Sequence, residues 1–178
     1  GWDPKGPAGV FSGKAGLDAD GKVVAYHFHG KGFTRQEMAT NESDPKDTLA
    51  GHLLGYQPKP TIIFQTPAEV YDFENKRHSW ETIPPMLDRA SPLRVSHFRD
   101  PLGPELHFAS ESFIDEVAHA AGADPVAFRL SYLAHNPRHS AVVKAVAEKA
   151  RWQAKPNPNR GKGDIMFGRG VSYAERNG

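Results

Sequence analysis

The first part of the chain alternates polar and apolar residues with the period of two that is typical of β-strands. Val10–Leu17 and Lys22–Phe28 flank Asp18-Ala19-Asp20-Gly21, a turn sequence, so the pattern predicts a β-hairpin. In the second strand the alternation assigns residues to two faces: Val24, Tyr26 and Phe28 to one, and Val23, Ala25, His27 and His29 to the other.

Further short apolar runs follow, bounded by proline or polar residues. They predict additional extended segments at Thr61–Phe64, Val70–Phe73, Ser79–Ile83 and Leu93–Arg99. The polar stretch Phe33–Gln57 is predicted to be a long loop with one helical turn.

The second half changes to the helical period of 3.6 residues. A helix is predicted over Ser110–Ala121, with a buried apolar stripe of Phe113, Ile114, Val117, Ala118 and Ala121. Gly122 is a natural helix stop. Asp124-Pro125 then supplies an N-cap and a proline at the first helical position.

Two shorter helices complete this region. The second is predicted over Val126–Ala134, and its inward residues are Val126, Leu130 and Leu133. The third is predicted over about His139–Arg151, and its apolar side is Val142, Val143, Val146, Ala147 and Ala150.

The last part of the chain is predicted to be a flexible loop followed by an extended segment. Gln153–Asp164 is rich in Pro, Asn, Gly and basic residues, and Ile165–Tyr173 reads as a strand. The expected fold class is α+β, with a β-rich first half that contains hairpins, a cluster of three helices and a trailing edge strand. We expect three regions: a partial domain over 1–152 (β-rich 1–100, helical 108–152), a flexible loop over 153–164 and a truncated strand over 165–178.

Composition excludes several function classes. The 178 residues carry 22 Lys+Arg and 21 Asp+Glu, a net charge of +1, so no basic excess favours nucleic acid. There is no cysteine, which excludes disulfides, thiol catalysis and iron–sulfur ligation within this chain. No apolar run approaches the roughly 20 residues that span a bilayer. The chain begins with Gly1, which either tag removal or an origin inside a longer protein explains. The compartment is not indicated.

Two groups of side chains contain residue types that bind metals or act as catalytic acids, but a purely structural role is favoured for each. His27 and His29 share a strand face, but no third ligand is evident, so exposed strand polarity is favoured over a metal site. Glu111 and Asp115 share a helix face and either is able to act as an acid. A solvated or capping acidic turn is favoured for them, and no catalytic residue is predicted.

The junction between the last predicted strand and the first long helix is a candidate anion site. Arg99 is followed by Pro101 and Gly103, so a guanidinium and backbone N–H groups meet near a helix N-terminus. Asp100 opposes this interpretation because a carboxylate repels an anion. A purely structural turn is the alternative.

Several motifs, taken in order, resemble the large subunit of molybdenum hydroxylases of the xanthine oxidase and aldehyde oxidase family. Phe98–Gly103 is similar to the family's arginine-containing turn, and Phe108–Ala118 to its F-A-x-E-x-x-x-D-E-x-A helix. Other similar segments are Gly16–Ala25 (A-L-D-A-D-G-x-I-x-A), Gly122–Arg129 (G-x-D-P-x-x-x-R), Ala147–Trp152 (A-E-K-A-G-W) and Gly168–Val171 (G-R-G-x). The resemblance is closest to the bacterial group of isoquinoline 1-oxidoreductase and the cytochrome-linked nicotinate dehydrogenase subunit.

This resemblance implies part of a molybdenum-cofactor-binding domain of a xanthine dehydrogenase-like subunit. It implies molybdopterin cytosine dinucleotide as cofactor and hydroxylation of an aldehyde or N-heterocycle with oxygen from water. It also implies an iron–sulfur subunit and a cytochrome c electron acceptor as partners. Arg99 and Gly103 are the expected cofactor-binding residues. The family's catalytic glutamate would lie beyond Gly178, so we expect the chain alone to be inactive. The matching motifs cover only part of a cofactor cleft, so we also expect the chain alone to bind no molybdenum.

An alternative function belongs to a different class. A non-catalytic binding or interaction module would keep the fold without the cofactor, and Asp100 is the residue that favours it.

Overall fold

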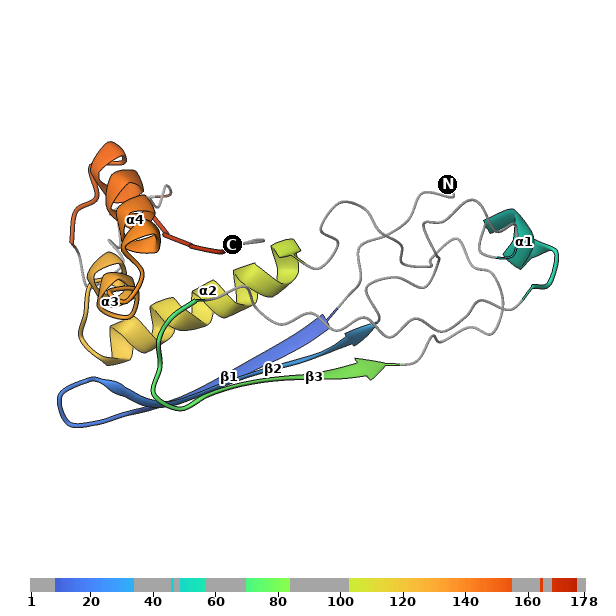
Figure 1. The fold of residues 1–178 in the computed structure, drawn as a ribbon, viewed down its shortest axis with the longest axis horizontal. Coiled ribbons are helices and arrows are strands. Elements are labelled where there is room, and N and C mark those ends of the chain that lie inside the picture. The colour runs from blue at the N-terminus through green and yellow to red at the C-terminus, as the bar shows by residue number, and fades with distance from the viewer. Residues whose placement is uncertain are drawn as a thin grey trace. The chain divides into compact units, whose positions relative to one another are not determined.

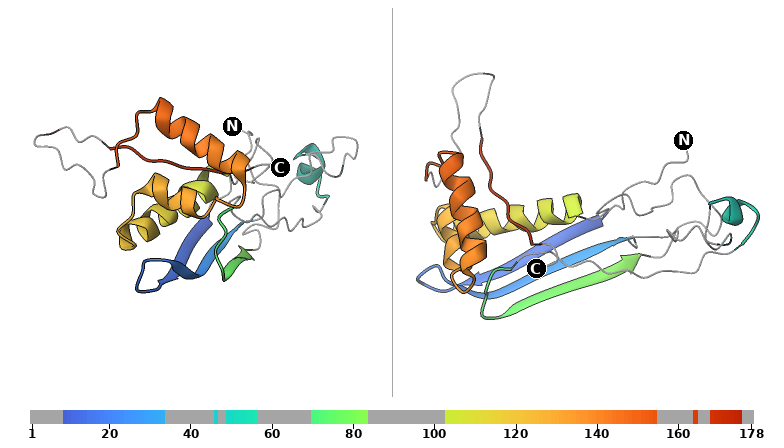
Figure 2. Two further views of the ribbon diagram at one scale, coloured as in Figure 1. Left: turned by 60° about the vertical axis from the view of Figure 1, so that its left-hand side comes forward. Right: turned by 45° about the horizontal axis from the view of Figure 1, so that its top comes forward.

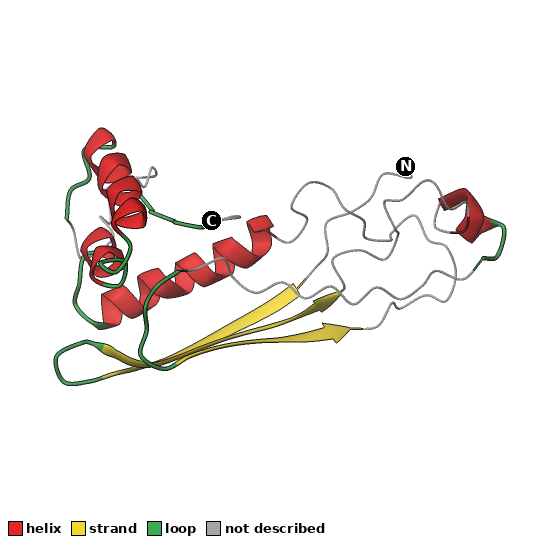
Figure 3. Cartoon of the chain, viewed as in Figure 1, coloured by secondary structure: helices red, strands yellow, loops and turns green. Residues whose placement is uncertain are grey.

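The computed structural model describes residues 9–33, 46, 49–56, 70–83, 103–154, 164 and 168–175. Figures 1 and 3 show the order of its elements along the chain: two strands, a short helix, a third strand and three further helices. This mixture confirms an α+β composition in which strands precede the main helices.

The strands form one three-stranded sheet. β1 (Gly9–Leu17), β2 (Val23–Phe33) and β3 (Lys76–Ile83) lie in the order β1-β2-β3, and the views of Figure 2 show them side by side. The predicted hairpin is confirmed, although β2 runs on to Phe33. Its turn is closed by Asp18, whose Oδ1 accepts the N–H groups of Asp20 and Lys22 at 3.0 and 2.8 Å.

The predicted alternation along β2 is correct only beyond its first residues. Tyr26 and Phe28 are both buried, but Val24 of the same predicted face is exposed, and Val23 of the other face is fully buried. The N–H of Val23 donates to the hydroxyl of Tyr132, 2.8 Å away, which follows the last residue of the helix Pro125–Ser131. The period of two therefore does not describe burial at the start of β2.

Val70–Phe73 is not a strand, contrary to the prediction. Tyr71 and Phe73 are buried, but Asp72 N–H donates to the carbonyl of Tyr132 at 2.9 Å and not to a neighbouring strand. The predicted strand at Ser79–Ile83 is confirmed as part of β3. The segments Thr61–Phe64 and Leu93–Arg99 lie outside the described residues. The helical turn expected within Phe33–Gln57 is α1 (Leu49–Leu53).

The first long helix begins earlier than the hydrophobic stripe indicated. α2 covers Gly103–Ala120, whereas the stripe predicted a start at Ser110. Pro104 is compatible with the first turn, where a backbone N–H has no helical acceptor, and Glu105 there favours the helix dipole. Of the predicted stripe, Ile114, Val117 and Ala118 are buried, while Phe113 and Ala121 are half-buried.

The next two helices both start at an N-cap followed by proline. α3 (Pro125–Ser131) begins after Asp124, whose Oδ1 accepts from Val126 N and Ala127 N, as predicted. α4 (Pro137–Lys149) begins after Asn136. In α3, Val126 is buried and Leu130 only half-buried, and Leu133 is buried just beyond the helix end.

The predicted apolar side of α4 is wrong. Val142 and Val146 are 50% and 51% exposed, and of the predicted stripe only Val143 is buried. The buried row starts at His139, one turn before Val143, because the ring of Tyr173 covers that imidazole with 5.6 Å between centroids.

The chain divides into two compact units. The first comprises 1–12, 28–66 and 78–106, and the second comprises 13–27, 67–77 and 107–178. In the first unit the ring of Phe11 lies between those of Phe28 and Trp80, at 6.0 and 6.2 Å.

The core of the second unit is an aromatic cluster. Tyr26 on β2 contacts Phe73 and, on α2, Phe113, at centroid distances of 4.8 and 5.5 Å. Phe73 in turn meets Tyr132 edge-on at 4.7 Å. The stripe of α2 therefore packs against the hairpin through Phe113, as its spacing predicted.

The last described segment is not the edge strand that was expected. Residues 168–175 are extended but form no strand, and residues 165–167 lie outside the described residues. The N–H of Tyr173 donates to the carboxylate of Glu111, 2.9 Å away, and Arg169 Nη1 donates to the carbonyls of Ala150 and Arg151. The backbone N–H of Tyr173 thus bonds to a side chain and not to a neighbouring strand, while the side chain of Arg169 holds the segment to the end of α4.

Candidate functional site

Only one of the two residues predicted to bind a cofactor lies in the described part of the structure. Arg99 lies outside the described residues. Gly103 is the first residue of α2, so it lies where the free N–H groups of a helix N-terminus are found. Two positions on, Glu105 has a buried carboxylate oxygen, Oε2, without a hydrogen-bond partner in the described part of the chain.

A buried ion pair joins α2 to α3 in the second unit. Arg129 is fully buried on α3, and its Nε donates to Oε2 of Glu111 on α2 at 3.1 Å. Nη2 of the same guanidinium donates to the backbone carbonyl of Glu111 at 3.1 Å, and Nη1 donates to Asp115 and to the carbonyl of Pro125. One arginine therefore ties together the middle of α2 and the start of its own helix.

The carboxylate of Glu111 also accepts hydrogen bonds from two segments that are distant in the sequence. The hydroxyl of Tyr71 donates to Oε2 at 3.1 Å, and the backbone N–H of Tyr173 donates to the same oxygen at 2.9 Å. We call Tyr71, Glu111, Asp115, Arg129 and Tyr173 the Glu111 cluster. The other oxygen, Oε1, is buried and has no partner among the described residues.

Burial dominates the electrostatics of this cluster. Loss of solvent raises the pKa of Glu111 above its usual value of 4.5, while Arg129 and the donated hydrogen bonds act in the opposite direction. Burial and the adjacent Glu111 also raise the pKa of the Tyr71 phenol well above 10.0. Both shifts accord with a phenol that donates its hydrogen bond to the Glu111 carboxylate.

The interpretation of Glu111 and Asp115 as a solvated acidic turn is wrong for Glu111. Its carboxylate is buried and its Oε2 accepts from Arg129, whereas Asp115 is partly exposed at the margin of the cluster. A sequence signal was present: Arg129 stands between Phe128 and Leu130 in a predicted short helix. A charged residue in an apolar row indicates a buried partner of opposite charge.

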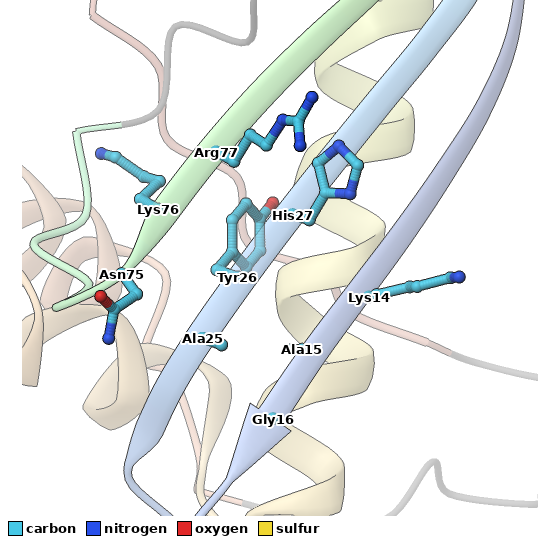
Figure 4. Close-up of a pocket in the computed structure, with 9 residues that line it drawn as sticks. All are labelled: Lys14, Ala15, Gly16, Ala25, Tyr26, His27, Asn75, Lys76 and Arg77. Carbon is cyan, nitrogen blue, oxygen red and sulfur yellow. The ribbon is translucent and has the colours of Figure 1, made fainter.

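A shallow hollow of about 540 Å³ lies on the sheet within the second unit. It is lined by Lys14, Ala15, Gly16, Ala25, Tyr26, His27, Asn75, Lys76 and Arg77. Figure 4 shows Lys14, His27 and Arg77 projecting from the three strands, with α2 behind them. Because Tyr26 contacts Phe113 of α2, its neighbour His27 points to the opposite face.

Neither histidine of the H-x-H pair is part of a group of metal ligands in the described region. His27 lines the hollow, and His29 Nδ1 is 2.9 Å from Ser79 Oγ. Within the described ranges no three His, Cys, Asp or Glu side chains are grouped as a metal site would require. None of the described helices has the length and apolar character needed to cross a bilayer.

Comparison with known proteins gives two relatives, and no family model matches the chain. The nicotinate dehydrogenase subunit designated B, from Pseudomonas putida, is 37% identical over 179 aligned residues, which cover 97% of this chain and 14% of that protein. The beta subunit of isoquinoline 1-oxidoreductase from Brevundimonas diminuta is 39% identical over 72 residues, 39% of this chain and 9% of that protein. The chain thus spans about one seventh of the length of the first relative.

The match to the first relative runs through almost the whole chain, so it includes the hairpin, the Glu111 cluster and the C-terminal segment. Both relatives belong to the group that the motifs resemble. The chain is therefore homologous to a segment of these oxidoreductase subunits, and the family resemblance found in its motifs is confirmed.

Proposed function

We propose that the chain is part of the molybdenum-cofactor-binding subunit of a multi-subunit oxidoreductase of the xanthine oxidase family. The observation that carries this proposal is the 37% identity that extends over 97% of the chain. Identity of that extent indicates a shared fold and supports a shared role for the whole protein.

The residues at the start of α2 fit a cofactor that combines phosphates with a nitrogen-rich ring. Gly103 lets a ligand approach the free N–H groups of the first turn, and these favour an anion. The buried Oε2 of Glu105 is an acceptor without a donor in the described region, and a ring N–H would satisfy it. Arg99, four positions before Gly103, carries a guanidinium suited to phosphate oxygens.

These residues would bind and orient molybdopterin cytosine dinucleotide. When bound, the cofactor supplies the two-electron oxidation in which oxygen from water enters a C–H bond of an aldehyde or N-heterocycle. Arg99 acts by charge and hydrogen bonding, not as acid or base, because a guanidinium stays protonated near neutrality. Electrons would leave through an iron–sulfur subunit to an acceptor such as cytochrome c.

The test uses the full-length subunit, expressed with its partner subunits in a host that makes the cofactor. Arg99→Lys keeps the charge but loses the two-pronged donor geometry, so we expect molybdenum content to fall. Activity per bound molybdenum should stay close to that of the parent enzyme. Arg138→Lys, on the exposed side of α4, is the matched control and should leave both quantities unchanged.

Two outcomes would contradict the proposal. Full molybdenum occupancy in Arg99→Lys with a collapse of turnover per site would place this arginine at the substrate. A full-length subunit that never contains molybdenum would favour a non-catalytic binding module. Turnover of nicotinate, isoquinoline and simple aldehydes, measured with the parent enzyme, would define the substrate class.

A further inference from the structure

We infer that the hollow on the sheet receives an acidic polypeptide segment of a partner subunit (Figure 4). This inference rests on the proposed function, in which the chain belongs to a multi-subunit enzyme. It adds a docking surface and the chemistry of the segment that the surface binds.

Charge is the first argument. Lys14, Lys76 and Arg77 line the hollow together with His27, and no aspartate or glutamate does. The complete chain is almost balanced, with 22 basic and 21 acidic residues, so the excess in the hollow is local. A surface of one sign is complementary to a partner of the opposite sign.

The exposed cations of the hollow differ in their ion pairing from other lysines on the same strands and turns. Lys22 lies 3.4 Å from Glu74, and Lys31 is paired with Glu81. In the part of the chain that the structure describes, neither Lys14 nor Arg77 has a carboxylate within salt-bridge distance. A carboxylate from outside the described residues would therefore complement both cations.

Shape is the second argument, and it favours a polypeptide over a small molecule. The floor of the hollow carries the small residues Ala15, Gly16 and Ala25, and a Cβ built on Gly16 would meet only ordinary contacts, the nearest at 3.5 Å. A backbone is able to approach such a floor closely. Small-molecule sites enclose roughly 70–90% of their ligand, which a shallow hollow on a sheet face does not do.

The rim is held in place before any partner arrives. Lys76 Nζ donates to the carbonyl of Tyr71 at 2.8 Å, and Asn75 Nδ2 donates to the carbonyl of Val24 at 2.9 Å. Tyr26 lies buried beneath, against Phe113. Fixed positions reduce the conformational entropy lost on binding, so the rim is preorganised for a ligand.

The experiment measures binding of a fluorescent deca-glutamate peptide to the full-length subunit at low ionic strength. In the double variant Lys14→Glu with Arg77→Glu, the Kd should increase about tenfold or more, because two attractive pairs become repulsive. The double variant Lys144→Glu with Lys149→Glu changes the net charge equally on exposed positions of α4 and should bind like the parent. Added salt should weaken parent binding.

Equal weakening in both double variants would show that only net charge matters and would overturn the inference. Pyrophosphate binding that is as tight as peptide binding and is lost in the same hollow variant would make this a small-anion site instead. If the glutamate variant fails to fold, Lys14→Gln with Arg77→Gln tests the same contacts. Molybdenum content is measured in parallel: peptide binding without molybdenum would contradict the proposed function alone.

Discussion

The guanidinium of Arg129 on α3 lies against the carboxylate of Glu111 on α2, with 3.1 Å between Nε and Oε2, and both side chains are shielded from solvent. A buried pair of this kind stabilises a protein only while both members are present. The pair therefore makes the packing of the two helices depend on matched charges.

Replacing Arg129 alone should be strongly destabilising. Arg129→Met leaves the Glu111 carboxylate buried without its partner, and the expected loss of unfolding free energy is about 3–5 kcal/mol. Urea denaturation measures it, with the exposed Arg138→Met as control at roughly 0.5 kcal/mol or less. Adding Glu111→Leu to Arg129→Met should recover much of the stability. A double variant no more stable than Arg129→Met would show that the charge pairing is unimportant.

Tyr71 should give the protein a specific sensitivity to alkali. Its pKa is raised by burial and by Glu111, so the folded state keeps a proton that the unfolded chain loses near pH 10. The resulting stabilisation is complete below about pH 10 and declines as pH rises toward the folded pKa, by about 1.4 kcal/mol per pH unit. Tyr71→Phe should remove this component from the slope of unfolding free energy against pH. The same substitution at the exposed Tyr56 should not. Identical slopes in all three proteins would refute the assignment.

Gly13 should tolerate no larger residue. A Cβ at this position would overlap the ring of Phe113, whereas one at Gly16 meets only ordinary contacts. Gly13→Ala is therefore expected to cost about 1–3 kcal/mol and Gly16→Ala much less, as judged by thermal unfolding. Combining Gly13→Ala with Phe113→Leu should recover part of the loss. Equal effects of the two alanine variants would contradict the predicted close packing.

Asp124 should stabilise α3 in two ways. Its Oδ1 caps the helix, and its Oδ2 accepts from Trp152 Nε1 at 2.9 Å. Asp124→Ala should cost about 1–2 kcal/mol through the lost cap, with a further loss from the unpaired indole. Trp152→Phe removes only the second contact. Because the cap dominates, chemical denaturation should show a smaller loss of unfolding free energy for Trp152→Phe than for Asp124→Ala. The reverse order would assign the main role to the tryptophan contact.

Local signals in the sequence predicted local structure well. Asp124-Pro125 placed the start of α3, Asp18–Gly21 placed the hairpin turn, and the spacing of Ile114, Val117 and Ala118 identified the buried side of α2. Each depends on residues within one turn of each other, so the information is contained in a short window. The family motifs, by contrast, were recognised through their order along most of the chain.

Features that depend on distant contacts were missed. Glu111 looked like a surface carboxylate because its donors come from Tyr71, Arg129 and Tyr173, far away along the chain. The apolar residues Val142 and Val146 looked like a core stripe but are half-exposed. Arg99, the main predicted cofactor contact, lies outside the described residues and remains a prediction.

The N–H of Tyr173 reaches the carboxylate of Glu111 across 62 positions of sequence. Because translation runs from the N-terminus, the ribosome adds Glu111 on α2 and Arg129 on α3 before Tyr173. Until Tyr173 has been added, Oε2 of Glu111 lacks one of the three donors that it has in the complete chain, which are Tyr71, Arg129 and Tyr173. The order of translation therefore makes completion of the Glu111 cluster wait for the last described segment of the chain.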